Sequence, residues 1–169
     1  EQYKNPAQSK IAEVTNKRCI KGTLADAMKG ADMFVGVSVG NVLSEEMVRT
    51  MAKDPIVFAL ANPVPEINPE LALRAGAKIV GTGSSRYPNQ INNALVFPGL
   101  FRGVLDVRAR DVTDEMMIAA SRGIASAISD EELSPSCILP KAIDINAHKA
   151  VAKAVREAAI ACGAARLKK

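Results

Sequence analysis

The chain has 169 residues, of which 48% are hydrophobic and only 4% are aromatic. This length suits one ordinary domain, and the scarcity of aromatic residues favours helices packed on a buried sheet. The net charge of +4 comes from 22 basic and 18 acidic residues that are mixed along the chain, with a basic tail at residues 166–169. A solvated terminus explains this balance better than a nucleic acid or membrane partner.

The cysteines and the ends of the chain bear on where the protein works. Cys19, Cys137 and Cys162 are odd in number and too widely spaced for a metal motif, so we expect reduced thiols and a cytoplasmic location. No apolar run approaches the roughly 20 residues that a membrane span needs. The chain begins with Glu1, and we expect it to start within a longer polypeptide.

The first half of the sequence alternates short helices with short apolar strands. Helix-forming stretches with capping residues or stop signals predict helices at residues 8–14, 23–29, 45–52 and 69–75. Continuous apolar runs predict strands at residues 33–38, 55–60 and 78–82. This order predicts an α/β fold with a parallel sheet covered on both faces, which is a partial doubly wound, Rossmann-like sheet.

From Asn92 onward the sequence becomes helical. Residues 92–109 can form one helix, which Pro98 should kink or restart. A second helix should run from a cap at Thr113 to about Ser129, and a last one, opened by residues 144–148, from position 150 to about position 162. We therefore divide the chain into residues 1–110, part of a Rossmann-like domain, and residues 111–169, a C-terminal helical extension packing on the same domain.

Small and carboxamide residues follow each predicted strand. Ligands of doubly wound sheets bind beyond the carboxyl ends of the strands, which makes these residues candidates for a site. Amide side chains donate and accept hydrogen bonds without carrying charge, so they can orient a carboxylate or a neutral amide. The candidates are Gly36, Val37 and Ser38 after the first strand, Asn62 after the second, Gly81, Thr82 and Gly83 at the end of the third, and the carboxamides of residues 89–93.

A phosphate-binding loop is missing from the sequence. A nucleotide-binding sheet normally carries Gly-x-Gly-x-x-Gly after its first strand, and no such motif occurs in the 169 residues. Either the domain does not bind a dinucleotide, or the loop belongs to a half that precedes Glu1.

These motifs together resemble the C-terminal, cofactor-binding half of the malic enzymes, in particular the short bacterial type. The resemblance covers about residues 12–154, and its matching segments are 36–38, 51–66, 81–83, 88–93, 97–99 and 102–103. It departs from the family at residues 84–87, Ser-Ser-Arg-Tyr, where many short members carry Arg-Ser-Asp-Tyr. The resemblance implies oxidative decarboxylation of malate to pyruvate and carbon dioxide with NAD or NADP, assisted by Mg²⁺ or Mn²⁺.

The same resemblance implies roles for individual residues. Asn62 and Asn93 would contact malate, with Asn92 beside them. The cofactor would lie along Gly36, Val37, Ser38, Asn62, Gly81, Thr82 and Gly83. The catalytic tyrosine and lysine and the metal ligands are expected outside this chain, in a missing N-terminal half through which the protein forms a homo-oligomer.

Simpler interpretations stand beside these. Asn62, which precedes a proline, could be only a turn residue. We expect His148 to be a surface or capping residue, Glu66 and Asp144 to be solvated or capping carboxylates, and Arg102 to form a surface salt bridge. Two other functions remain open: a nucleotide-binding or regulatory module without catalysis, and a dehydrogenase for another small acid.

Overall fold

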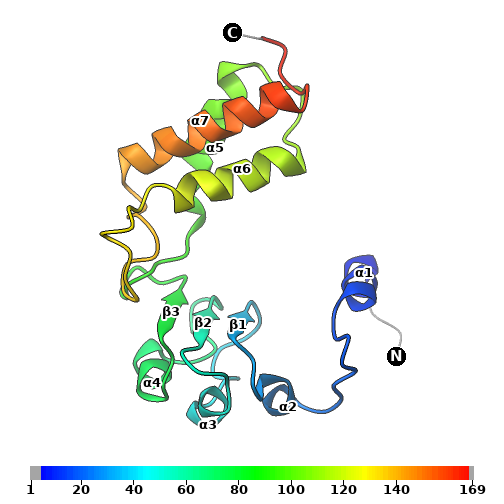
Figure 1. The fold of residues 1–169 in the computed structure, drawn as a ribbon, viewed down its shortest axis with the longest axis vertical. Helices are drawn as coiled ribbons and strands as arrows, with labels where there is room; N and C mark the ends of the chain where they lie inside the picture. Colours follow the sequence, from blue (N-terminus) through cyan, green and yellow to red (C-terminus); the bar gives the residue numbers. More distant parts are fainter. Residues whose placement is uncertain (1–4, 168–169) are drawn as a thin grey trace.

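The computed structural model describes residues 5–167, which form a sheet layer followed by a layer of helices (Figure 1). Their elements confirm the predicted α/β class, and the three strands lie where the apolar runs placed them. In chain order the elements are α1 (Pro6–Val14), α2 (Leu24–Met28), β1 (Met33–Gly36), α3 (Glu45–Arg49), β2 (Ile56–Ala59), α4 (Pro69–Arg74), β3 (Ile79–Thr82), the short 3-10 helix η1 (Asn93–Leu95), α5 (Phe97–Asp106), α6 (Asp114–Ala125) and α7 (Ile145–Ala161).

The strands form a parallel sheet in the order β1-β2-β3. Val57 of β2 pairs with Phe34 of β1 and with Val80 of β3, so these three side chains share one face of the sheet. Helices α2, α3 and α4 pack on this face, where Val57 and Val80 are buried in one hydrophobic core with residues of all three helices.

The predicted cover on the second face is incomplete among residues 5–167: Gly81 of β3 is buried, with Ile91 next to it, whereas β1 lies open. The two crossovers run in the same direction along the sheet, so their helices fall on the same side of it. On the other face Met33 and Val35 are 44% and 55% exposed.

The helical layer has a second core. Helix α7 packs against both α5 and α6, and its residues Val151 and Val155 are fully buried. The approach is close because glycines face α7: a Cβ atom at Gly103 of α5 would lie 2.8 Å from the Cβ of Val155. Helix α5 packs with this layer although it precedes residue 110, and the domain boundary at residue 110 stays a prediction.

Helix ends follow local sequence. Pro98 lies in the first turn of α5 after η1, so the expected restart of the helix is confirmed. Helix α6 ends at Ala125, four residues short of the predicted Ser129, because the chain tightens there into three-residue turns such as Ala127 N to Ile124 O at 3.1 Å. Asp144 caps α7 through Asn146 N at 2.8 Å, which confirms its predicted capping role.

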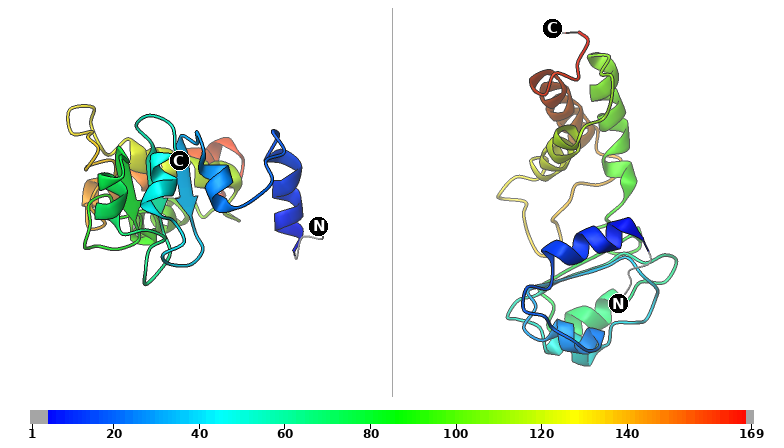
Figure 2. Two further views of the ribbon diagram at one scale, coloured as in Figure 1. Left: turned by 90° about the horizontal axis from the view of Figure 1, so that it is seen from below. Right: turned by 90° about the vertical axis from the view of Figure 1, so that its right-hand side faces the viewer.

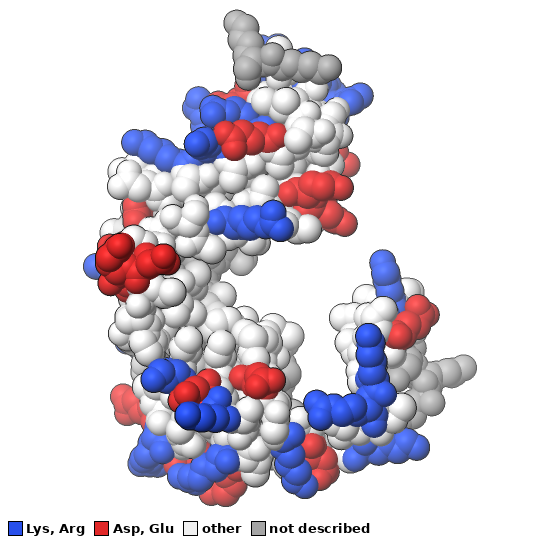
Figure 3. Space-filling view, viewed as in Figure 1, with Lys and Arg blue, Asp and Glu red and all other residues white. Residues whose placement is uncertain are grey.

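The two layers enclose a hollow on one side. The strands point toward it in Figure 1, and the space-filling view shows that its wall is largely uncharged, while charged side chains gather on the outer ends of the molecule (Figure 3). Helix α1 buries none of its residues and stands apart from both layers (Figure 2). Within the described residues, no helix combines the length and the apolar character that a membrane crossing requires.

Candidate functional site

The candidate residues lie along the carboxyl edge of the sheet. Residues 37–38 follow β1, residues 60–62 follow β2, and Gly83 follows β3. Thr82 forms a parallel bridge to Gln90, and Ile91 N donates to Thr82 O at 2.8 Å. The segment leading to Asn92 and Asn93 therefore starts alongside the end of β3, and all four segments border one edge.

Asn62 connects the ends of β2 and β3. Its side chain is exposed, and its Nδ2 donates to Leu60 O at 3.4 Å. A Cβ atom at Gly83 would lie only 2.9 Å from this Nδ2, so the side chain of Asn62 rests directly on the glycine. Any larger residue at position 83 would displace the Asn62 amide.

Asn92 and Asn93 differ in what their side chains do. Asn92 Oδ1 accepts a hydrogen bond from Ala94 N at 2.9 Å and caps η1, which confirms that one member of the cluster is a cap. Asn93 is exposed at the first position of η1. The binding roles of Asn62, Asn92 and Asn93 stay predictions.

The turn after β1 is exposed at Val37 and Ser38, whereas Gly36 is buried. A Cβ atom at Gly36 would meet the Glu66 carboxylate, with Oε1 2.5 Å away. Thr82, at the end of β3, is 1% exposed, and its Oγ1 accepts from Ser84 N at 3.2 Å, which shapes the turn through Gly83.

Glu66 is fully buried beneath this edge, so the expectation of a solvated or capping carboxylate is wrong. Its Oε1 accepts from Ser38 N at 2.9 Å, and its Oε2 accepts from Ala61 N at 3.0 Å. Burial raises the pKa of the Glu66 carboxyl, but the bonds from these backbone N–H groups outweigh burial and hold the pKa below its ordinary value of 4.5. The side chain is therefore an anion at neutral pH, compensated by N–H dipoles.

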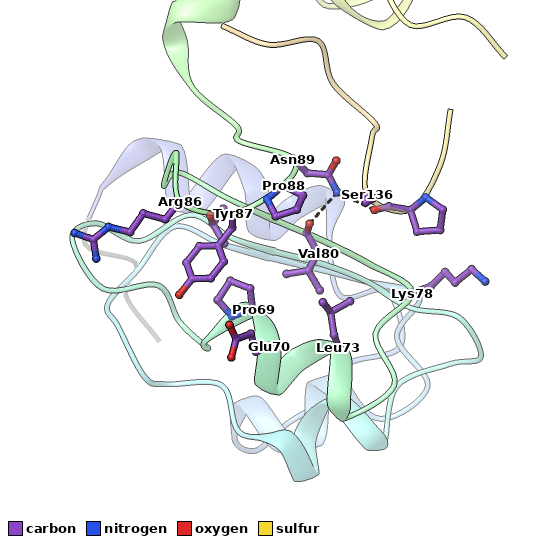
Figure 4. A pocket seen from close by; sticks show the side chains of 12 residues that line it. Pro69, Glu70, Leu73, Lys78, Val80, Arg86, Tyr87, Pro88, Asn89 and Ser136 are labelled. Atoms are coloured by element: carbon purple, nitrogen blue, oxygen red, sulfur yellow. Dashed lines mark hydrogen bonds between the residues drawn. The ribbon is translucent and has the colours of Figure 1, made fainter. Parts of the chain in front are cut away.

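Asn89 is the second residue whose role the sequence did not reveal. It is 7% exposed, with Nδ2 donating to Val80 O at 3.0 Å and to Pro135 O at 2.8 Å, while its Oδ1 accepts from Ile138 N at 3.0 Å (Figure 4). Asn89 thus joins β3 to the segment between α6 and α7, directly before the bridge that leads to Asn92 and Asn93.

A pocket of about 620 Å³ lies beside β3 and α4, below Asn89 (Figure 4). Tyr87 lies between Arg86 and Glu70 in this view, while Arg86 and Lys78 point away from the pocket. Of the candidate site residues, Thr82 and Asn89 line this space, and those that follow β1 and β2 do not, so the pocket adjoins the carboxyl edge only at β3.

The other residues weighed from the sequence lie in the helical layer. His148 of α7 has Nε2 3.0 Å from Ala142 O, and its Nδ1 is buried without a hydrogen-bond partner in the described structure. It is half-buried in this layer, so the surface alternative is wrong, while the capping alternative stays a prediction. Arg102 pairs with Asp106 at 2.8 Å on the surface of α5, which confirms the expected salt bridge.

Metal ligands do not gather in residues 5–167. No three His, Cys, Asp or Glu side chains of this range lie close enough together to hold an ion. Glu66, the carboxylate nearest the candidate edge, is occupied by N–H donors and cannot open toward a cation without losing them. The described residues therefore do not fit a metal centre of their own.

A parallel sheet with helical crossovers and small, uncharged residues along its carboxyl edge is typical of Rossmann-like domains, which bind their ligands at that edge. A family model described as "Malic enzyme, NAD binding domain" matches residues 2–160. The chain belongs to this family, as the resemblance in its sequence implied.

Relatives and solved structures agree with this assignment. The chain is 52% identical over 163 residues to a bifunctional malic/malolactic enzyme of Bacillus subtilis, covering 96% of this chain and 40% of that protein. It is 49% identical to an NAD-dependent malic enzyme of Geobacillus stearothermophilus, covering 98% and 34%. The crystal structure of malic enzyme from Pyrococcus horikoshii matches with a TM-score of 0.88 at 48% identity, covering 92% of this chain and 36% of that one. The chain thus spans well under half the length of these proteins.

Proposed function

We propose that the chain supplies the cofactor-binding domain and part of the substrate site of a malic enzyme. The reaction is the oxidative decarboxylation of malate to pyruvate and carbon dioxide with NAD or NADP. The observation that carries this proposal is the row of exposed, uncharged groups along the carboxyl edge. In this row Asn62 rests on Gly83, and Gln90, two residues before Asn92, forms a bridge with Thr82 at the end of β3. Both NAD-dependent and NADP-dependent enzymes occur among the relatives, so the proposal covers either cofactor.

The residues of this edge position the reactants. The exposed turn at Val37 and Ser38 offers backbone for the cofactor to lie against. Gly36, Gly81 and Gly83 shape this edge by letting Glu66, Ile91 and Asn62 pack directly on their backbone. Asn62 and Asn93 would donate hydrogen bonds to the malate carboxylate and to the carboxamide of the cofactor, which would orient the substrate beside the group that supplies hydride acceptance. Loss of the 3-carboxylate as carbon dioxide then leaves the enolate of pyruvate, which is protonated at C3.

The remaining catalytic groups come from outside these 169 residues. We expect these groups to be a tyrosine and a lysine that transfer protons, together with the acidic ligands of Mg²⁺ or Mn²⁺. A metal held by those ligands would supply Lewis-acid chemistry. We use "complete enzyme" below for the assembly that contains this chain and those groups, which we also propose to be a cytoplasmic homo-oligomer.

The test is Asn93→Ala in the complete enzyme, with malate and each cofactor, followed by the absorbance of the reduced nicotinamide. We expect a higher KM for malate and a lower kcat, because an amide that orients the substrate is removed. Asn146→Ala, an exposed asparagine on α7, is the matched control and should leave both constants unchanged.

Two results would contradict the proposal. If the complete enzyme reduces neither cofactor with malate, the proposed malic enzyme activity is ruled out. If Asn93→Ala leaves the kinetics unchanged, Asn93 does not belong to the substrate site. Lactate should be measured beside pyruvate, because the relative from Bacillus subtilis is described as a bifunctional malic/malolactic enzyme.

A further inference from the structure

Glu66 bridges two strand ends of the site with a single side chain. Ser38 belongs to the turn after β1, and Ala61 follows β2 directly before Asn62. Each end uses its own carboxylate oxygen: Oε1 accepts from Ser38 N at 2.9 Å and lies 3.4 Å from Ser38 Oγ, while Oε2 accepts from Ala61 N at 3.0 Å. The side chain is fully buried, so water does not compete for these bonds.

The surroundings select a full-length carboxylate. Both oxygens face donors, so a glutamine would turn its NH₂ group toward one of two N–H groups. An aspartate keeps the charge but is one methylene shorter, so it cannot reach both ends. Gly36 completes the fit, since a Cβ atom there would lie 2.5 Å from Oε1.

We propose that Glu66 is a positioning residue that sets the distance between the cofactor turn at Ser38 and the substrate amide of Asn62. It touches neither ligand and acts through the backbone of both segments. This inference rests on the proposed function, because it assigns Ser38 to the cofactor and Asn62 to malate.

The consequence is that one carboxylate supports the binding of two ligands. Loss of a charge-assisted hydrogen bond corresponds to about a tenfold change in an equilibrium constant. In the complete enzyme, Glu66→Gln should therefore raise the dissociation constant of reduced cofactor about tenfold without malate present, and also raise the KM for malate. A residue that only stabilises the fold would leave both constants unchanged in the enzyme that remains folded.

Three variants separate positioning from charge and from stability. Glu66→Asp keeps the charge, so a purely electrostatic role would be rescued, whereas a bridging role gives the same weakening as Glu66→Gln. Glu70→Gln removes an exposed charge four residues away and should change neither constant. Val155→Ala weakens the core of the helical layer and should lower the unfolding temperature without changing the dissociation constant or KM.

A double-mutant cycle tests whether Glu66 acts through Asn62. In an Asn62→Ala background, Glu66→Gln should add less than about twofold to the KM for malate, because the amide it positions is gone. It should still weaken cofactor binding, because the bond from Ser38 N to Glu66 Oε1 does not involve the Asn62 amide, but by less than tenfold, since Asn62 is itself expected to line the cofactor site. If the effects of Glu66→Gln and Asn62→Ala on the KM for malate are fully additive, Glu66 does not act through Asn62.

Amide hydrogen exchange gives a readout that needs no activity. In the full chain, Glu66→Gln should speed the exchange of Ser38 and Ala61 N–H, and Glu70→Gln should not. If the wild-type enzyme is inactive, the proposed function is wrong, and hydrogen exchange still shows whether Glu66 holds the Ser38 and Ala61 N–H groups. An active wild type in which Glu66→Gln and Glu66→Asp leave cofactor binding and KM unchanged defeats the inference alone.

Discussion

Asn89 offers the sharpest test of how the two layers are joined. Its side chain makes three hydrogen bonds, to Val80 O, Pro135 O and Ile138 N, and its backbone has a φ of +56° in the left-handed region. Asn89→Gly removes the bonds but tolerates this φ. Asn89→Ala removes the same bonds and adds backbone strain.

The two contributions can be estimated separately. At about 1 kcal/mol for each hydrogen bond, Asn89→Gly should lower the free energy of unfolding by about 3 kcal/mol. The left-handed conformation costs alanine about 1 kcal/mol more than it costs asparagine or glycine, so Asn89→Ala should lose about 4 kcal/mol. Equilibrium urea unfolding, followed by circular dichroism, measures both values.

Asn41 provides the matched control. It has a φ of +61°, its side chain is exposed, and no side-chain hydrogen bond is formed by it within the described structure. Asn41→Ala should therefore cost about 1 kcal/mol and Asn41→Gly almost nothing. An Asn89→Gly variant as stable as the wild type, or an Asn89→Ala variant more stable than Asn89→Gly, would refute the reasoning.

Three further predictions concern the site and the thiols. Gly36→Ala should lower the unfolding temperature by about 5 °C in a thermal scan, because its Cβ atom meets the Glu66 carboxylate, which cannot move without losing its bonds; an unchanged midpoint would contradict this. The pKa of Glu66 is depressed in the folded protein, so the ionised carboxylate stabilises the fold above pH 4.5, and this stabilisation is lost as the pH falls through the folded pKa. In an acid titration the Glu66→Gln variant should therefore lose stability less steeply than the wild type. Parallel curves for the two proteins would count against this reasoning. A thiol reagent should label the exposed Cys19 and Cys162 faster than the half-buried Cys137, as peptide mapping would reveal.

The strands could be predicted because their signal is local. Each is a continuous apolar run closed by small or turn-forming residues, and the parallel order then places Ser38, Asn62 and Gly83 at one edge. The open face at Val35 could not be predicted, because the side that right-handed crossover helices take depends on the order of the strands, which the apolar runs do not reveal.

The buried polar residues escaped prediction because their partners are remote. Glu66 bonds to Ser38, 28 positions earlier, and Asn89 bonds to Ile138, 49 positions later. Asn62, Pro63 and Val64, which come shortly before Glu66, are exposed, so no local pattern indicated that this carboxylate would be buried. For Asn89 the carboxamide cluster gave no sign of which member would be buried.

The exposed face and the unpaired edge of β1 have a practical consequence. This strand ends the sheet among the described residues, and it displays Met33 and Val35 next to backbone groups that pair with no other strand. The unpaired N–H and C=O groups of an edge strand are a template for pairing with an extended segment, including another copy of the same strand. Concentrated solutions of the 169-residue chain should therefore build up β-rich aggregates, and a lysine in place of Val35 should delay their appearance.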